Sequence, residues 1–146
     1  MTSEIREAVG LVERCFAAIA AHDADGLVEN YAENYVLELP YYKPDEPLVL
    51  SGRPVVHAYL RTLLAVQHME IVLTGHHWIP SERLLIAEYE SRGHFLDNGE
   101  PYQNRYVGYW YIEDGVVVRL REYYNPEAPR ASAVEAERRE RSGSNA

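Results

Sequence analysis

The glutamate at position 122 is the residue of this sequence whose setting best suits chemistry. It lies in residues 116–124, which are predicted to form a strand whose side chains alternate between two faces. The other residues on its face are Val116, Val118 and Leu120. The opposite face carries Arg119 and Arg121, so we expect Glu122 to point into an apolar interior. A carboxylate in such a place loses hydration and its pKa rises, which suits a general acid or base near neutral pH. The alternative is a glutamate at the strand end that faces solvent or pairs with an arginine.

The preceding predicted strand, residues 102–112, places further polar groups beside this carboxylate. If Arg105 faces solvent, the inward row consists of Asn104, Tyr106, Gly108, Trp110 and Ile112. We expect Tyr106 to donate a hydrogen bond at the catalytic centre, and Asn104 and Trp110 to contact the substrate. Apolar walls with a few hydrogen-bonding groups are typical of small-molecule pockets. For Trp110, simple packing in the core is the alternative.

Tyrosine is unusually frequent, with twelve residues against two phenylalanines. We expect four more tyrosines to line or enter the pocket: Tyr41, Tyr42, Tyr59 and Tyr89. Tyr41 and Tyr42 end a predicted strand, and Tyr89 lies on a strand face opposite Glu88 and Glu90. Three others fall on the outer face of the predicted sheet, where a second sheet would pack: Tyr109, Tyr111 and Tyr123. The excess therefore marks two surfaces, and only the one shared with Glu122 bears on catalysis.

The histidines and the cysteine add little to this site. His57, at the edge of the apolar face of a predicted helix, is a candidate second catalytic group, with a histidine at the pocket rim as the alternative. His76 and His77 are adjacent in a strand and point apart, and no carboxylate–histidine group has the spacing of metal ligands. Cys15 belongs to an apolar helix face, so we expect it to pack in the core. We therefore expect acid/base chemistry without a metal or an organic cofactor, or simple ligand binding.

The elements that must position these residues have an α+β order. Helices are predicted over residues 3–21, over a short segment capped by Asp23 that includes Tyr31, and from Pro54 to about Leu64. A strand is predicted over 35–42, followed by a proline-bounded loop over 43–52. The remaining strands are predicted over 69–79, 83–95, 102–112 and 116–124. Three helices followed by a strongly curved, mainly antiparallel sheet would enclose a cone with a closed floor and an open mouth.

Length and charge restrict the class of protein. The 146 residues fit one domain, which we place at residues 1–126, with a polar tail at 127–146. A net charge of −9 argues against a nucleic-acid partner. No apolar run is long enough to span a membrane, and the acidic N-terminus differs from a signal peptide, so we expect a cytoplasmic protein.

Four segments together resemble the nuclear transport factor 2-like superfamily, in its SnoaL-like or ketosteroid-isomerase-like group. They are YAENYVLELPY at 31–41, GRPVVHAYL at 52–60, EYESRGHF at 88–95 and PYQNRYVGYWYIEDGVVVRLREYYNP at 101–126. The last of them is most similar to the phenazine-biosynthesis A/B proteins. The resemblance implies a conical pocket, a homodimer formed through the sheet, no cofactor, and Glu122 as the acid/base residue.

The leading hypothesis is a cofactor-independent isomerase, cyclase or dehydratase that acts on a hydrophobic, ring-bearing secondary metabolite. Glu122 would move the proton, and Tyr106 and Asn104 would donate hydrogen bonds to a substrate oxygen. Two alternatives stay open. One is a binding or carrier protein without catalysis, and the other is a dimerisation module with a vestigial pocket.

Overall fold

A computed structural model describes residues 2–127 of the chain. Its α-helices are α1 (Ser3–Ala20), α2 (Ala24–Val28) and α3 (Arg53–Val66). Its strands are β1 (Tyr31–Lys43), β2 (Glu46–Ser51), β3 (Gln67–Ile79), β4 (Leu84–Phe95), β5 (Pro101–Glu113) and β6 (Val116–Tyr124), with a short 3₁₀ helix at Pro80–Glu82. The tail expected at 127–146 lies, apart from its first residue, outside the described residues.

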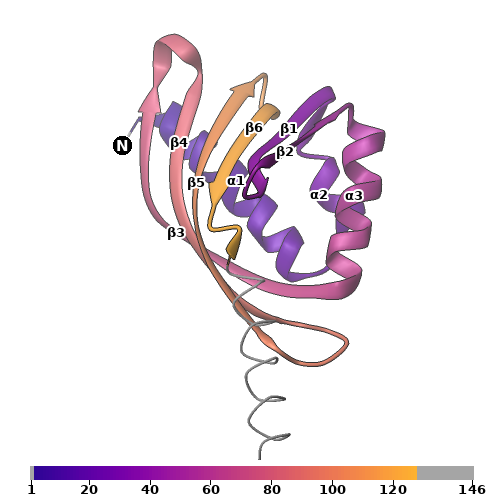
Figure 1. The fold of residues 1–146 in the computed structure, drawn as a ribbon. Coiled ribbons are helices and arrows are strands. Elements are labelled where there is room, and N and C mark those ends of the chain that lie inside the picture. The colour runs from indigo at the N-terminus through magenta and orange to yellow at the C-terminus, as the bar shows by residue number, and fades with distance from the viewer. Residues whose placement is uncertain (1, 128–146) are drawn as a thin grey trace, which may run out of the picture.

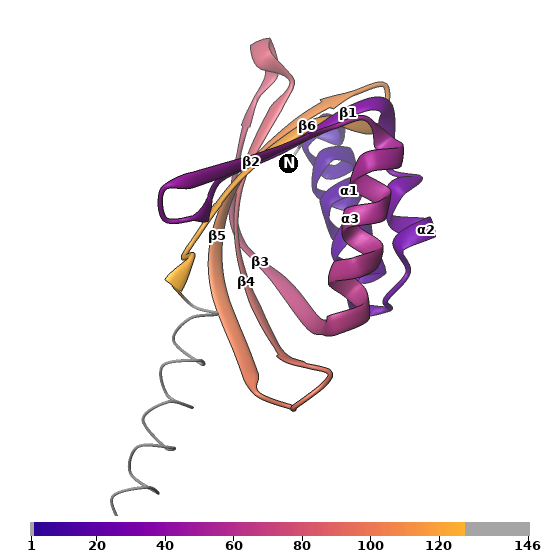
Figure 2. The same ribbon diagram turned by 45° about the vertical axis from the view of Figure 1, so that its right-hand side comes forward.

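The six strands form one curved, open sheet in the order β2-β1-β6-β5-β4-β3. β1 and β6 run parallel, and every other neighbouring pair is antiparallel. In Figures 1 and 2 the long strands β3, β4 and β5 bend strongly, and α1 and α3 lie on the concave side of the sheet. This confirms the α+β fold of three helices on a curved, mainly antiparallel sheet.

α1 and α2 begin where the sequence supplies side-chain caps, whereas α3 begins after Gly52 with a proline in its first turn. The Thr2 hydroxyl accepts a hydrogen bond from the backbone N–H of Ile5, and the Asp23 carboxylate accepts one from Gly26. α1 buries an apolar stripe that consists of Ala8, Leu11, Val12, Cys15 and Phe16. Burial raises the pKa of the Cys15 thiol to about 12, which fits its predicted packing role. No helix in residues 2–127 is long and apolar enough to cross a lipid bilayer.

The prediction of a loop over residues 43–52 is wrong for most of that segment, because residues 46–51 form β2. Leu48 and Leu50 are partly buried while Val49 between them is exposed, which is the alternation of a strand with one covered face. Pro47 is tolerated because β2 is an edge strand and needs no ladder hydrogen bond on its outer side. Tyr31 also belongs to a strand, β1, and not to the second helix as predicted.

Two bulges shift the predicted alternation of side chains. In β6 the pairing with β5 skips Val118, so Val117 is buried and the expected inward row of Val116 and Val118 is wrong at its start. In β1 the register with β2 shifts between Leu39 and Lys43, and this interval contains the two tyrosines Tyr41 and Tyr42. Beyond the β6 bulge, Leu120 and Glu122 keep the predicted inward direction.

Candidate active site

A cavity of about 380 Å³ lies between α1 and α3 on one side and the concave face of the sheet on the other. Its size falls within the usual range of small-molecule sites. Its walls are mainly aromatic and aliphatic, and among its described lining residues Glu122 is the one charged side chain. Six of the nine residues predicted for the site line it: Tyr42, Tyr59, Tyr89, Tyr106, Trp110 and Glu122.

Glu122 projects from β6 into this cavity, where the Tyr89 hydroxyl donates a hydrogen bond to its Oε2 atom. Burial raises the pKa of Glu122 from 4.5 to about 7, and the hydrogen bond from Tyr89 acts in the opposite direction because it stabilises the charged carboxylate. Tyr89 itself is fully buried, and burial beside Glu122 raises the pKa of its hydroxyl well above the ordinary value. Tyr89 therefore remains a hydrogen-bond donor at any physiological pH.

Gly108 makes this contact between two non-adjacent strands possible. Tyr89 lies on β4 and Glu122 on β6, and Gly108 on the intervening β5 is the register partner of Glu122. A Cβ atom at Gly108 would lie 2.5 Å from the Tyr89 hydroxyl and 2.5 Å from Nε1 of Trp110. Gly108 was not among the predicted site residues. A glycine inside a strand often marks such a close approach, so the signal was present.

Tyr106 lines the cavity next to Tyr89, with the two rings stacked at a centroid separation of 5.0 Å. Its hydroxyl is hydrogen-bonded to Oγ of the buried Ser91, at 2.7 Å. Burial raises the pKa of Tyr106 far above the ordinary value, so this phenol also stays protonated. Tyr106 can therefore act as a neutral hydrogen-bonding group, with Ser91 as a partner that sequence reasoning missed.

One buried polar atom of the cavity lining, Nε2 of Gln67, has no hydrogen-bond partner among the described residues. Two other buried polar groups of the lining lie beside a hydroxyl: Trp110 is next to Tyr89, and Tyr35 is next to Tyr31. Native proteins leave few buried polar atoms unpaired, because each costs desolvation free energy. Tyr35, whose ring stacks on Tyr31 at 4.0 Å, and Gln67 were not among the predicted site residues. Nε2 of Gln67 can therefore donate to a polar group of a molecule inside the cavity.

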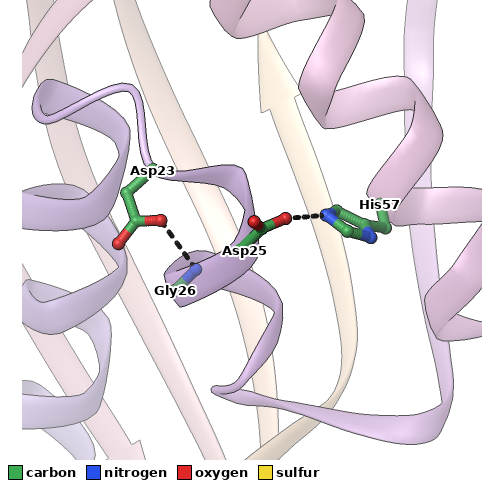
Figure 3. A network of polar contacts seen from close by, with 4 residues as sticks. All are labelled: Asp23, Asp25, Gly26 and His57. Atoms are coloured by element: carbon green, nitrogen blue, oxygen red, sulfur yellow. Dashed lines mark hydrogen bonds and ion pairs between the residues drawn. The ribbon is translucent and has the colours of Figure 1, made fainter.

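His57 does not line the cavity. It lies on α3, and its Nε2 atom is 2.7 Å from Oδ1 of Asp25 at the start of α2 (Figure 3). Figure 3 also shows the Asp23 carboxylate capping Gly26, a contact within the start of α2 itself. The structure therefore places His57 apart from Glu122, as a residue that joins α3 to α2.

Asn104 and Tyr41 are also placed elsewhere. Asn104 is buried, but its amide donates to the Tyr102 hydroxyl at 2.9 Å and to the carbonyl of Asn125 at 3.0 Å. It thereby fixes the chain after β6. Tyr41 is 49% exposed and contacts the ring of Tyr123 on the outer face of the sheet, as expected if the β1 bulge has turned it away from the interior.

The remaining polar chemistry of the described residues is sparse. Residues 2–127 contain no group of three or more His, Cys, Asp or Glu side chains placed to hold a metal ion. The arrangement in the cavity is a single carboxyl group with a pKa near neutrality, surrounded by neutral donors and aromatic rings. Such a site can accept and return a proton while donors stabilise charge that develops on a ligand oxygen.

Comparison with known proteins points to one family. A model of the SnoaL-like domain matches residues 12–120. The protein YesE of Bacillus subtilis is 25% identical over 127 residues, which cover 86% of each chain. A solved structure of a candidate isomerase from Bacillus subtilis has a TM-score of 0.80 at 25% identity and covers 87% of this chain and 92% of its own. A Mycobacterium tuberculosis protein solved with estradiol-17β-hemisuccinate has a TM-score of 0.71 at 20% identity, with coverage of 84% and 96%.

Proposed function

This chain belongs to the SnoaL-like domain family, and from that premise we propose that it is an enzyme in which Glu122 moves a proton on a ring-bearing, hydrophobic small molecule. The reaction would be an isomerisation, cyclisation or dehydration that needs no cofactor. The single observation that supports this most strongly is the Glu122 carboxyl group inside an aromatic cavity, hydrogen-bonded by Tyr89 and with its pKa raised to about 7.

A pKa of about 7 gives the carboxyl group both roles of an acid/base catalyst. Near neutral pH about half of the molecules carry a carboxylate, which can take a proton from a carbon next to a substrate carbonyl. The carboxylic acid so formed returns the proton to another atom of the substrate. The enolate oxygen that exists between these steps would accept a hydrogen bond from a neutral donor of the lining, such as the Tyr106 phenol.

The relatives support a small-molecule ligand. One protein of the same fold was solved with estradiol-17β-hemisuccinate, and another, from Catenulispora acidiphila, with trimethylamine. The cavity of this chain, with its aromatic walls, is suited to a ring-bearing compound. The substrate of this chain is therefore expected to be a compact apolar molecule with at least one carbonyl group.

Proton movement can be tested without the natural substrate. An uncharged ring ketone with acidic protons next to its carbonyl, such as 2-tetralone, is incubated with the protein in D₂O, and deuterium uptake is followed by mass spectrometry. The proposal expects faster exchange than in buffer alone, because Glu122 removes a proton, exchanges it with solvent and returns a deuteron. Binding of ring ketones without any accelerated exchange would favour a carrier protein instead.

Replacement of Tyr89 by phenylalanine is expected to move the pH dependence of this exchange. The lost hydrogen bond stabilised the charged carboxylate, so the pKa of Glu122 rises above about 7. A hydrogen bond to a charged group is worth about 1.5–3 kcal/mol, so the rising limb of the pH–rate profile should move up by roughly one to two pH units. Tyr109→Phe on the outer face is the control. An unchanged profile in Tyr89→Phe would show that Tyr89 does not act on Glu122.

We infer that the outer face of the sheet forms a homodimer. Tyr109 and Tyr123 lie together there with ring centroids 6.0 Å apart, and the Arg121 guanidinium lies 4.7 Å from the Tyr109 ring centre. Tyr41 and Val107 extend this exposed patch. Aromatic rings and arginine are enriched at protein interfaces. Analytical ultracentrifugation should therefore give about twice the 16.8 kDa chain mass, whereas a single-chain mass at micromolar concentration would contradict the inference.

A further inference from the structure

We propose that His22 and His68 form an acid-sensitive latch at the rim of the cavity, closed while the two imidazoles share a hydrogen bond and open once both are protonated. The latch would control how fast a ligand leaves. This inference rests on the proposed function only in assuming that the cavity holds a ligand, and it does not depend on catalysis by Glu122. It gives a role to two histidines that are not part of the cavity lining.

The two imidazoles form a direct hydrogen bond in the plane of their rings. Nε2 of His22 lies 2.8 Å from Nδ1 of His68. The ring planes are 16° apart and the ring centroids are 5.0 Å apart, which is the separation expected when the two nitrogens point at each other edge to edge. His22 lies in the turn between α1 and α2, and His68 is the second residue of β3. The bond therefore joins the helices to the sheet.

A neutral pair allows only one arrangement of the protons. Nδ1 of His22 lies 2.7 Å from the backbone carbonyl oxygen of Leu64, and a carbonyl can only accept, so this nitrogen carries a proton. Nε2 of His22 is then the acceptor, and Nδ1 of His68 donates. The other nitrogen of His68 lies 3.9 Å from Oε1 of Glu70. One added proton on His68 therefore leaves the bond intact, and the Glu70 carboxylate balances its charge.

A second added proton breaks the bond. A doubly protonated imidazole has no acceptor nitrogen, so two imidazolium rings cannot hydrogen-bond to each other, and their like charges repel. Histidine side chains change charge between about pH 5 and 8, so we expect the bond to be lost in the lower part of that range. His22 keeps its bond to Leu64, because the charged ring still donates through Nδ1. The ring that separates is therefore that of His68.

The charged groups around the pair lie on the helices and on β4. Those that share a surface hollow with His22 belong to α2 and α3 and their caps: Asp23, Asp25 and Arg61. Both of these carboxylates already have partners within the helix layer. On β4, His94 is the register partner of His68, with ring centroids 5.4 Å apart, and Arg92 is the register partner of Glu70. Protonation of His94 in the same pH range would add positive charge beside His68.

The latch acts on the cavity through the junction of α3 and β3. Leu64 and His68 flank Val66 and Gln67, which both line the cavity. Val66 is 50% exposed, so this end of α3 is part of the cavity rim. The backbone carbonyl of Val66 also accepts a hydrogen bond from the N–H of Leu96. Loss of the bond between His22 and β3 leaves the junction with one tie fewer, so the rim opens more often.

The test measures how fast an uncharged ring compound leaves the cavity. 4-Hydroxybiphenyl, which stays uncharged over this pH range, is bound to Glu122→Gln, so that the carboxyl group of the cavity cannot contribute to the pH dependence. Its displacement by excess 2-tetralone is followed by tryptophan fluorescence in a stopped-flow instrument at pH 7.5 and pH 5.5. We expect dissociation to be about five-fold faster at pH 5.5, which corresponds to the loss of one hydrogen bond.

Two substitutions at position 68, made in the same background, separate the latch from general effects of acid. In His68→Gln the amide can donate to His22 or accept from it, so dissociation should be slow at both pH values. In His68→Leu no such bond can form, so dissociation should be fast at both. The control is His77→Gln, which replaces an exposed histidine elsewhere on β3 and should keep the full response to acid.

Two outcomes of the kinetic experiment would overturn the latch. One is a dissociation rate that is equal at the two pH values, and the other is an acid response that persists in His68→Gln. Histidine ¹⁵N NMR at pH 8 checks the bond without a ligand: Nδ1 of His22 should carry a proton and Nε2 should not, and the opposite tautomer would contradict the latch. A probe that does not bind would count against the proposed function, and this NMR result would still decide the hydrogen bond.

Discussion

Replacement of Glu122 by glutamine is expected to slow ketone deuterium exchange by about 10²–10⁴-fold, because general acid/base catalysis contributes that much and an amide cannot take up the proton. Glutamine has nearly the same shape, and its carbonyl oxygen can still accept the hydrogen bond from Tyr89. Affinity for 4-hydroxybiphenyl should therefore change little. The measurement is the initial rate of deuterium uptake at pH 7.5 with the probe affinity determined in parallel.

The control for this result is Glu88→Gln, which removes a carboxylate of β4 that is exposed outside the cavity. Its exchange rate should equal that of the wild-type protein. If both variants exchanged deuterium at the wild-type rate, Glu122 would not be the acid/base group. A loss of probe binding in Glu122→Gln would instead indicate a role in holding the ligand.

The same substitution is expected to stabilise the folded protein above pH 7. The pKa of Glu122 is raised from 4.5 to about 7, so the folded state holds its proton more tightly than the unfolded state. Stability is then highest below pH 4.5, falls as pH rises from about 4.5 to about 7, and stays reduced above that range. The shift corresponds to about 3 kcal/mol of lost unfolding free energy in the wild-type protein.

Glutamine does not titrate, so Glu122→Gln should escape this loss. The difference in unfolding free energy between variant and wild type should grow by up to about 3 kcal/mol between pH 4.5 and pH 8, which is several degrees in Tm for a domain of this size. Urea unfolding at several pH values measures it, and the comparison cancels every other titrating group. A difference that does not depend on pH would contradict a buried, uncompensated carboxylate.

Much of the fold could be predicted because the spacing of apolar residues along the chain follows the repeat of a helix or a strand. The stripe of α1 and the inward direction of Glu122 were both available from the spacing of apolar residues. The errors arose where the period is interrupted. Nothing in the alternation of residues 116–120 signals that the bulge at Val118 places Val117 in the core. The same holds for the register shift in β1 between Leu39 and Lys43, the interval that contains Tyr42.

The site itself depends on pairing between distant segments, which a single sequence does not display. The Tyr89–Glu122 hydrogen bond requires the registers of β4 with β5 and of β5 with β6, and also the glycine at 108 between them. The sequence placed Tyr89 near the interior but gave no reason to pair it with Glu122. Likewise, His57 has a suitable position on its helix, yet its partner Asp25 comes from another helix.

We propose that the Glu122 carboxyl group titrates near neutrality inside a ligand cavity. This can be measured by a ¹³C NMR titration of the protein labelled at its glutamate carboxyl carbons, with the Glu122 signal identified by its absence in Glu122→Gln. We expect one glutamate signal with a midpoint of about 7, which changes when 4-hydroxybiphenyl fills the cavity. A Glu122 midpoint near 4.5 that is insensitive to the probe would show that Glu122 is an ordinary solvated carboxylate.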